Sequence, residues 1–206
     1  MKIETCIIPA AGASSRMGEW KLLLPWGKST IVERVVANAL EAELEVLVVA
    51  GFRGDELHAL LDGRPGVRVL DNPDWREGML GSILRAVDLV SGEAFFVTPA
   101  DMPMIGPGLY RLLMAEAQSA AGPEAIAAPD VPKHAGITYF AACGGVPGHP
   151  VLIPRDRVPA MKALDRGGTM RAFLMEGPWR LVETGEAAVH ADIDSPADFE
   201  AARPSI

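Results

Sequence analysis

Short apolar runs alternate with segments whose apolar residues recur at helical spacing through the first 130 residues. The runs are Cys6–Pro9, Glu45–Ala50, Val67–Leu70, Ala94–Thr98 and Ala125–Ala128. Continuous apolar strands separated by helices are typical of βαβ units, in which helices cover both faces of a parallel sheet. The pattern therefore predicts a doubly wound α/β fold with a mostly parallel sheet.

The clearest predicted helix lies between the first two runs. Its apolar positions are Ile31, Val32, Val35, Val36, Ala39 and Leu40. Thr30 and Glu33 have the spacing of a capping box, which indicates that this helix begins after Thr30. Two further helices are predicted around 83–87 and 109–116.

The second half of the chain has a different pattern. Residues 130–150 are rich in Gly and Pro around one hydrophobic run. The elements expected after it are a strand at 151–154, helices at 156–164 and up to about Met175, the segment 179–183, and a closing helix after Pro196. We therefore expect the second half to form an elaborated C-terminal edge of the sheet, which would act as a lid or a dimer surface.

Length and composition narrow the class of protein. The 206 residues suit a single α/β domain, and 49% hydrophobic with 22% charged residues argues against a disordered chain. No apolar run approaches the roughly 18–20 residues of a membrane span, and the start lacks a signal-peptide pattern, so the predicted location is the cytoplasm. A net charge of −8 disfavours nucleic acid and anionic membranes as partners, but allows one anionic small molecule held by local cations and a metal.

The first run leads directly into PAAGASSRMGEWK, residues 9–21. A Gly/Ala/Ser loop at the end of a strand presents backbone N–H groups that can cradle phosphate oxygens, and Arg16 and Lys21 add two cations. The loop matches neither GxGxxG nor the P-loop pattern. The alternative is an ordinary turn with two solvated cations. As exposed charges, both are expected to contribute little to folding stability.

Asp101 follows the run Ala94–Thr98, in the segment PADMP. A carboxylate at the carboxyl end of a central strand lies where open α/β sheets bind ligands, and it suits a hard divalent cation. The alternative is that Asp101 caps the helix that follows Gly106, but Pro103 and Pro107 indicate a loop between Asp101 and that helix.

Asp192 and Asp194 alternate in HADIDSPADF, so in an extended segment both side chains point to the same face. Two such carboxylates repel each other unless a cation lies between them, which makes them candidate metal ligands. Alternatively, Asp194 caps the helix that begins at Pro196, although Ser195 can serve as that cap.

PAAGASSRMG with its following lysine, DMP, GHPVLIP and DIDSPADF occur in this order over nearly the whole chain. Together they resemble the MobA-like nucleotidyltransferases, and among these the molybdenum cofactor cytidylyltransferases. The resemblance implies a Rossmann-like fold that transfers a nucleoside monophosphate from an NTP to a phosphate or sugar. It implies one domain, with a nucleotide-binding half (1–128) and an acceptor-binding half with the closing helix (129–206).

The resemblance also assigns roles to individual residues. The catalytic residues would be Arg16, Lys21 and Asp101, with Mg²⁺ held by Asp101 and by Asp192 or Asp194. The nucleotide would contact Lys21 and the residues Ala10, Ala11, Gly12, Ala13, Ser14, Ser15, Arg16, Gly78 and Ser82. Residues 72–82 match a segment that lines the nucleotide pocket in the family, but this chain has Leu80–Gly81–Ser82 where relatives often carry two or three serines. The acceptor would contact Gly148, His149 and Pro150.

Ala11 favours a cytidine nucleotide over a guanosine nucleotide, because guanylyl-transferring relatives usually carry a glycine at this position. The resemblance therefore implies that CMP passes from CTP to the phosphate of a molybdopterin-type acceptor and that pyrophosphate leaves. The expected partners are these small molecules. A transient contact with a molybdoenzyme or its chaperone is also compatible with the resemblance.

Other functions remain compatible with the sequence. Guanylyl transfer to molybdopterin, or transfer to a sugar phosphate or methylerythritol phosphate, would use the same opening loop. A non-catalytic cofactor-binding protein is a second class, although Arg16, Lys21 and Asp101 together argue against it. A Rossmann oxidoreductase is a third class, but the first strand lacks GxGxxG.

Overall fold

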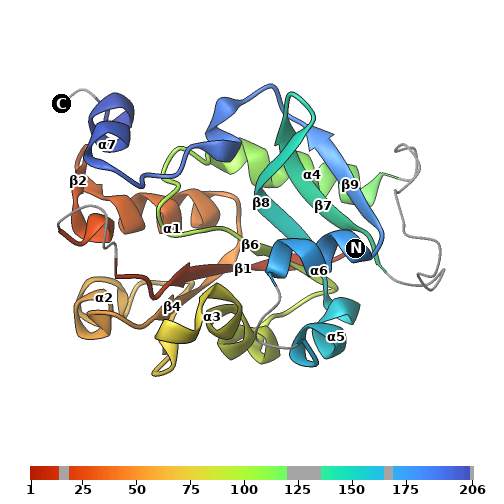
Figure 1. The fold of residues 1–206 in the computed structure, drawn as a ribbon, viewed down its shortest axis with the longest axis horizontal. Coiled ribbons are helices and arrows are strands. Elements are labelled where there is room, and N and C mark those ends of the chain that lie inside the picture. The colour runs from red at the N-terminus through yellow and green to blue at the C-terminus, as the bar shows by residue number, and fades with distance from the viewer. Residues whose placement is uncertain (14–18, 120–135, 165–168, 205–206) are drawn as a thin grey trace.

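The computed structural model describes residues 1–13, 19–119, 136–164 and 169–204, and its centre is a seven-stranded sheet (Figure 1). The strand order is β5–β4–β1–β6–β8–β7–β9. The strands are β1 (Ile3–Ala10), β4 (Glu45–Ala50), β5 (Val67–Asp71), β6 (Ala94–Val97), β7 (Thr138–Cys143), β8 (Val146–Pro154) and β9 (Trp179–Glu183). A separate hairpin pairs β2 (Pro25–Trp26) with β3 (Ser29–Thr30).

The sheet is mostly parallel, as the sequence predicts. Strand β1 pairs in parallel with β4 and β6, β4 with β5, and β7 with β9. Among the described strands of this sheet, β8 alone runs opposite to its neighbours β6 and β7. Strands from both halves of the chain thus form one continuous sheet.

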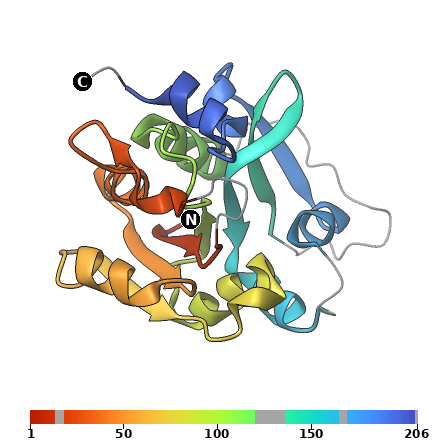
Figure 2. The same ribbon diagram turned by 60° about the vertical axis from the view of Figure 1, so that its left-hand side comes forward.

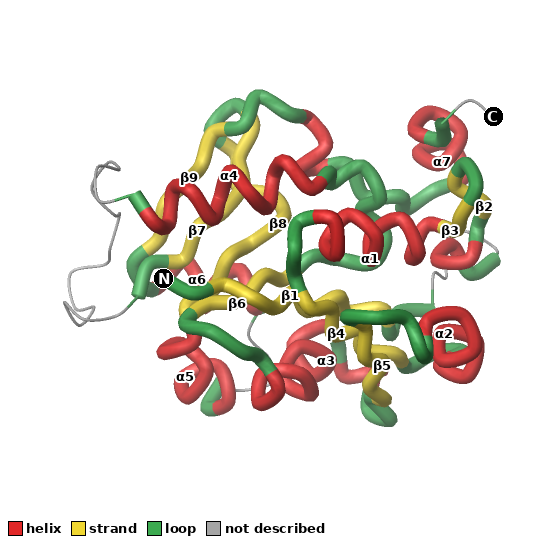
Figure 3. Tube along the Cα trace, turned by 180° about the vertical axis from the view of Figure 1, so that it is seen from behind, coloured by secondary structure: helices red, strands yellow, loops and turns green. Residues whose placement is uncertain are grey.

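Helices cover both faces of the sheet, as Figure 3 shows from behind. They are α1 (Ile31–Glu41), α2 (Gly54–Leu61), α3 (Met79–Ala86), α4 (Pro107–Gln118), α5 (Val158–Lys162), α6 (Met170–Glu176) and α7 (Pro196–Ala202). Alternate residues of β1 face opposite cores: Cys6 and Ile8 pack with α1, α2 and α4, whereas Ile7 packs with α3, α5 and α6. This two-sided burial confirms the doubly wound α/β fold.

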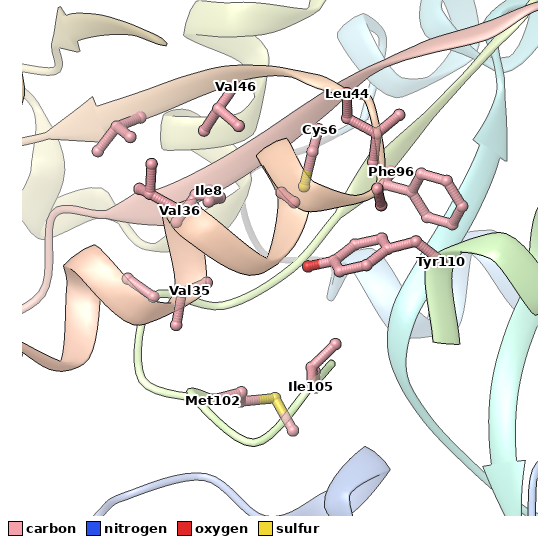
Figure 4. Packing of buried hydrophobic residues seen from close by; sticks show 14 of the residues in the cluster. Cys6, Ile8, Val35, Val36, Leu44, Val46, Phe96, Met102, Ile105 and Tyr110 are labelled. Carbon is pink, nitrogen blue, oxygen red and sulfur yellow. The ribbon is translucent and has the colours of Figure 1, made fainter. Parts of the chain in front are cut away.

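One of the two cores is shown in Figure 4. Phe96 from β6 meets Tyr110 from α4 edge-on, with ring centroids 5.1 Å apart. The Tyr110 hydroxyl donates to the buried Thr98 hydroxyl at 3.0 Å, so the polar end of this ring is satisfied within the core. The helix that carries Tyr110 is thereby fixed against the strand that leads to Asp101.

Both expected helix starts are confirmed. Thr30 and Glu33 form the capping box of α1, and Ser195 forms one with Asp198 at the start of α7. Each box satisfies backbone N–H groups that the first helical turn leaves without partners. Asp194 is therefore not needed as the cap of α7.

The loop ends of β1 and β6 meet where the strand order reverses. From β1 the chain continues to β4 and β5 on one side, and then crosses to β6 on the other side of β1. Open α/β sheets bind ligands in the crevice outside such a switch point. The segments that follow Ala10 and Val97 both begin there.

The second half differs in detail from the expected elements. Strand β8 begins at Val146, well before the predicted 151–154, because Pro147 still pairs with Ala142 of β7. The predicted helix over 156–164 is shorter: a 3₁₀ turn, Arg155–Arg157, precedes α5. The predicted strand at 125–128 lies outside the described residues.

The closing helix packs on the N-terminal hairpin, and Figures 1 and 2 show α7 beside this part of the chain. Phe199 of α7 lies 6.3 Å from the ring of Trp26, and the fully buried Ile193 joins the same cluster. This packing brings the 192–194 segment next to the residues that follow the first loop. No helix in the described part of the chain is long and apolar enough to cross a membrane.

Candidate active site

A pocket of about 320 Å³ opens at the switch point between β1 and β6. Residues from the ends of both strands, from α3 and from the segment before α7 line it: Pro9, Ala10, Ala11, Gly12, Lys21, Leu22, Trp75, Gly78, Met79, Ser82, Pro99, Ala100, Asp101 and Asp194. Residues from the first loop with its lysine, from the 72–82 segment, from the segment of Asp101 and from that of Asp194 thus meet in one place.

Lys21 lies at the centre of the charged groups. Its Nζ is 2.7 Å from Asp101 Oδ2 and 2.7 Å from Asp194 Oδ1, and its side chain is only 11% exposed. Burial alone lowers the pKa of Lys21, but the two carboxylates outweigh it and hold the pKa above its ordinary value. Lys21 is therefore a buried, charged partner of both acids, and the expectation that it is an exposed cation was wrong.

Asp101 has one oxygen without a protein partner. Oδ2 binds Lys21, whereas Oδ1 is buried and has no hydrogen-bond partner among the described residues. A buried carboxylate oxygen is costly to leave unpaired, and a cation can satisfy it. Gly106, not Asp101, is the N-cap of α4, so the capping alternative is excluded.

Asp192 and Asp194 lie on either side of the buried Ile193, whose backbone N–H donates to the Asp101 carbonyl at 3.0 Å. Asp194 lines the pocket at the switch point, whereas Asp192 lines a neighbouring pocket. In the described part of the chain, no three His, Cys, Asp or Glu side chains gather as a metal site. Asp101 and Asp194 are brought together by Lys21, which contacts both.

The described part of the first loop is held by its backbone. The Ala11 carbonyl accepts from Phe52 N–H at 3.1 Å, and the Gly12 carbonyl accepts from the Trp20 indole at 3.1 Å. Ala10, Ala11 and Gly12 line the pocket; Ala13 is described but does not. The predicted contacts Ser14, Ser15 and Arg16 lie outside the described residues.

The 72–82 segment forms another wall of this pocket. Gly78 has φ +109°, a conformation that side chains rarely adopt, and Ser82 is buried and accepts from the Asn72 amide at 3.1 Å. Trp75 and Met79 also line the pocket, within the segment that the resemblance assigns to the nucleotide, although neither was named there individually. Their only signal in the sequence is their position inside this segment.

Ala11 borders this wall closely. A Cβ added at Gly51 would lie 2.7 Å from the Ala11 methyl and 2.5 Å from Trp75 Cβ. Only a glycine at position 51 lets the loop and the tryptophan approach each other in this way. The Ala11 methyl thus lies at the edge of the pocket beside an aromatic side chain.

A second pocket of about 370 Å³ adjoins the first and shares Met79, Pro99 and Asp101 with it. Its other lining residues are Ile83, Val97, Met102, Phe140, Pro147, Gly148, His149, Val151, Ile153, Met170, Arg171, Leu174, Val189, His190 and Asp192. Gly148 and His149 of the predicted acceptor motif are among them, whereas Pro150 is buried in β8 and not part of the lining. The motif lies on a strand, not in the loop that its Gly and Pro content had suggested.

His149 is a half-buried imidazole that stays neutral at neutral pH. Burial lowers its pKa to about 4, although the Val97 backbone partly opposes this. In the unfolded chain, His149 takes up a proton near pH 6.5, well before it does so in the folded protein. The contribution of this group to the free energy of unfolding is therefore fully present above pH 6.5 and falls as the pH drops towards 4. Between pH 7 and pH 4.5 we expect the wild type to lose roughly 2–3 kcal/mol of stability from this one group, a loss that His149→Gln would not show.

Urea unfolding at pH 7 and pH 4.5 measures this difference. His58→Gln is the matched control, because the His58 pKa is raised, first by Asp62 and also by Asp71. Its replacement should therefore increase the loss of stability in acid. Equal acid sensitivity in His149→Gln and the wild type would contradict the prediction.

A loop at the switch point of a parallel sheet, facing a lysine and two carboxylates, defines a nucleotide-binding α/β protein. The model of the MobA-like NTP transferase domain matches residues 6–183, so the chain belongs to this family of nucleotidyltransferases. It is 35% identical over 205 residues to the molybdenum cofactor cytidylyltransferase of Escherichia coli (strain K12), which covers 98% of this chain and 97% of that relative. The family expected from the motifs is confirmed.

Solved structures support the same fold. The chain superposes on a nucleotidyl transferase from Methanothermobacter thermautotroptrophicus with a TM-score of 0.77 at 23% identity, over 98% of this chain and 95% of the other. A protein of Mycobacterium tuberculosis H37Rv, solved in complex with manganese, matches with a TM-score of 0.73 at 18% identity over 100% of both chains. At these identities the similarity establishes the Rossmann-like fold.

Proposed function

We propose that the protein transfers CMP from CTP to the phosphate of a molybdopterin-type acceptor and releases pyrophosphate. The observation that carries this proposal is the meeting of two pockets at Asp101. A nucleotide in the first pocket and an acceptor in the second would have their phosphates at one carboxylate. The 35% identical Escherichia coli relative, a molybdenum cofactor cytidylyltransferase, supports this choice of substrates.

The first pocket is the proposed nucleotide site. The triphosphate would lie on the loop amides from Ala10 onward, with Arg16 and Lys21 holding the leaving pyrophosphate. Gly78 and Ser82 line another wall, where the base and ribose would lie. These groups stabilise developing negative charge, which is electrostatic catalysis and needs no acid–base step.

Mg²⁺ is the proposed cofactor, and the residues present fit it. Asp101 offers a buried oxygen without a partner among the described residues. Asp194 contacts Lys21, the lysine that also pairs with Asp101. Asp194 lines the nucleotide pocket and Asp192 the second one, which favours Asp194 as the further ligand. Once bound, Mg²⁺ would neutralise charge on the phosphate oxygens during transfer.

The second pocket is the proposed acceptor site. Its walls are largely apolar, with Phe140, Val151 and Leu174 among them, and Arg171 supplies a cation. Apolar walls with a few polar groups suit a flat heterocycle that carries a phosphate. Because a phosphate monoester is already ionised near neutral pH, its attack on the α-phosphorus needs no general base, and no covalent enzyme intermediate is required.

The function is tested by incubating the protein with each NTP, Mg²⁺ and molybdopterin, and identifying the product by mass spectrometry. The expected product is the cytidine dinucleotide of molybdopterin, with pyrophosphate released. Transfer of another nucleotide, or only to a sugar phosphate or methylerythritol phosphate, would replace the substrate assignment. Binding without turnover would favour a cofactor-binding protein.

Nucleotide choice depends on Ala11 in this proposal. Ala11 lines the pocket together with Trp75, and in this proposal its methyl would disfavour a purine. One methyl is worth about 1–3 kcal/mol, or roughly 10–200-fold, so we expect a clear but incomplete preference for CTP over GTP. Ala11→Gly should relax this preference when the two nucleotides compete at equal concentration and both products are quantified. Equal use of GTP by the wild type would refute the cytidine assignment.

A further inference from the structure

The Lys21 ammonium is placed where a cation between two carboxylates would lie. Its Nζ is 2.7 Å from an oxygen of Asp101 and 2.7 Å from an oxygen of Asp194. The Lys21 side chain is 11% exposed and the Asp101 side chain 21%, so water screens this pair only weakly. These are the same two carboxylates that the proposed function assigns to the metal.

We propose that Lys21 is an exchangeable internal cation that occupies the metal position until the nucleotide arrives. In the nucleotide-free protein, its ammonium satisfies both acids and excludes a divalent ion. When the nucleotide binds, Lys21 turns to the phosphates and releases the carboxylates to the metal. This inference rests on the proposed function, and it concerns the order in which the ligands bind.

Charge explains why the metal and the ammonium would not share the acids. A divalent ion bound to Asp101 and Asp194 would lie within a few ångströms of Nζ, and like charges at that distance repel strongly. A triphosphate removes this conflict, because it brings several negative charges into the same pocket. The ammonium then gains phosphate partners as it loses the carboxylates.

The position of Lys21 in the chain allows such a movement. Lys21 is the first residue of a short 3₁₀ helix, Lys21–Leu23, and reaches the acids through its four-carbon stem. The backbone of Gly12 lines the same pocket, so the loop that would hold phosphates faces the lysine. A rotation of the side chain can therefore exchange one set of partners for the other without a change of fold.

The experiment is a titration of the nucleotide-free protein with Mn²⁺ alone, in which free Mn²⁺ is measured by electron paramagnetic resonance. Wild type, Lys21→Met and Lys28→Met are compared. Lys28→Met is the matched control, because Lys28 is an exposed lysine of the β2–β3 turn and its loss changes the net charge equally. We expect Lys21→Met to bind Mn²⁺ at least tenfold more tightly than the wild type, and Lys28→Met to equal the wild type.

A double variant locates the bound ion. Adding Asp101→Asn to Lys21→Met should abolish the gain in Mn²⁺ affinity, because it removes one of the two released carboxylates. Mn²⁺ binding by Lys21→Met that is equal to or weaker than that of the wild type would overturn the proposal. So would a gain that survives Asp101→Asn.

Thermal unfolding provides an independent readout. Mn²⁺ alone should raise the Tm of Lys21→Met and leave that of the wild type nearly unchanged. If Lys21→Met does not fold, Lys21→Gln replaces it, and tight binding of Mn²⁺ to the nucleotide-free wild type would by itself overturn the proposal. Because no substrate is present, a failure of cytidylyl transfer would leave these results standing, and the two proposals can fail separately.

Discussion

Replacing Asp101 with Asn is expected to abolish nucleotidyl transfer while the protein remains folded. The change keeps the shape of the side chain but removes the negative charge of the carboxylate that faces both pockets. A hard divalent cation binds an amide oxygen far more weakly than a carboxylate, and a metal at a phosphate contributes several kcal/mol to transition-state stabilisation. We therefore expect kcat to fall by about three decades or more.

The measurement is Mg²⁺-dependent turnover, accompanied by thermal unfolding. Asp88→Asn is the matched control, because Asp88 is an exposed carboxylate that pairs with Lys162 on the surface. It should leave both activity and stability close to the wild type. An Asp101→Asn protein with normal unfolding and near-normal, Mg²⁺-dependent activity would refute the assignment of Asp101.

Arg16→Ala and Lys21→Ala should each lower kcat/KM by about one to three decades, the rough range for losing one charge-stabilising contact. Their effects on stability should differ. Arg16 is expected to contribute little to folding, as a cation in a loop. Lys21→Ala leaves Asp101 and Asp194 without their shared cation, which should cost about 1–2 kcal/mol because Asp194 is 41% exposed and partly screened by water.

Urea unfolding next to steady-state kinetics separates the two effects. Unchanged kcat/KM in Arg16→Ala would remove this arginine from the proposed phosphate site. Strong destabilisation of Lys21→Ala with intact catalysis would assign the lysine a structural role only.

The core of the fold could be predicted because its signals are local. The apolar runs became the strands β1, β4, β5 and β6, and the Thr30–Glu33 box marked the start of α1. Residues 146–150 could not be assigned in this way. Their Gly and Pro residues indicate a loop, whereas pairing of Val146 and Pro147 with β7 extends β8 through them.

The same difference between local and long-range signals applies to the site. Asp101 could be predicted because it follows the carboxyl end of a central strand, where open α/β sheets bind their ligands. Lys21 contacts Asp194 because the chain returns to this end of the sheet, where Phe199 of the last helix packs on Trp26 of the N-terminal hairpin. Because that contact joins distant parts of the chain, no periodicity near Lys21 reports it.

The docking of α7 also affects how the protein opens. The hydrogen bond between Lys21 and Asp194 joins residues 173 positions apart and ties the segment before α7 to the first loop. Local opening reactions usually involve elements with little buried surface, and α7 buries no residue completely. Undocking of this helix together with the adjoining Ile193 would therefore take Asp194 away from the site while the sheet stays intact. Amide hydrogen exchange in α7 would then report the occupancy of a pocket at the opposite end of the sequence, since a ligand that uses Asp194 slows the undocking.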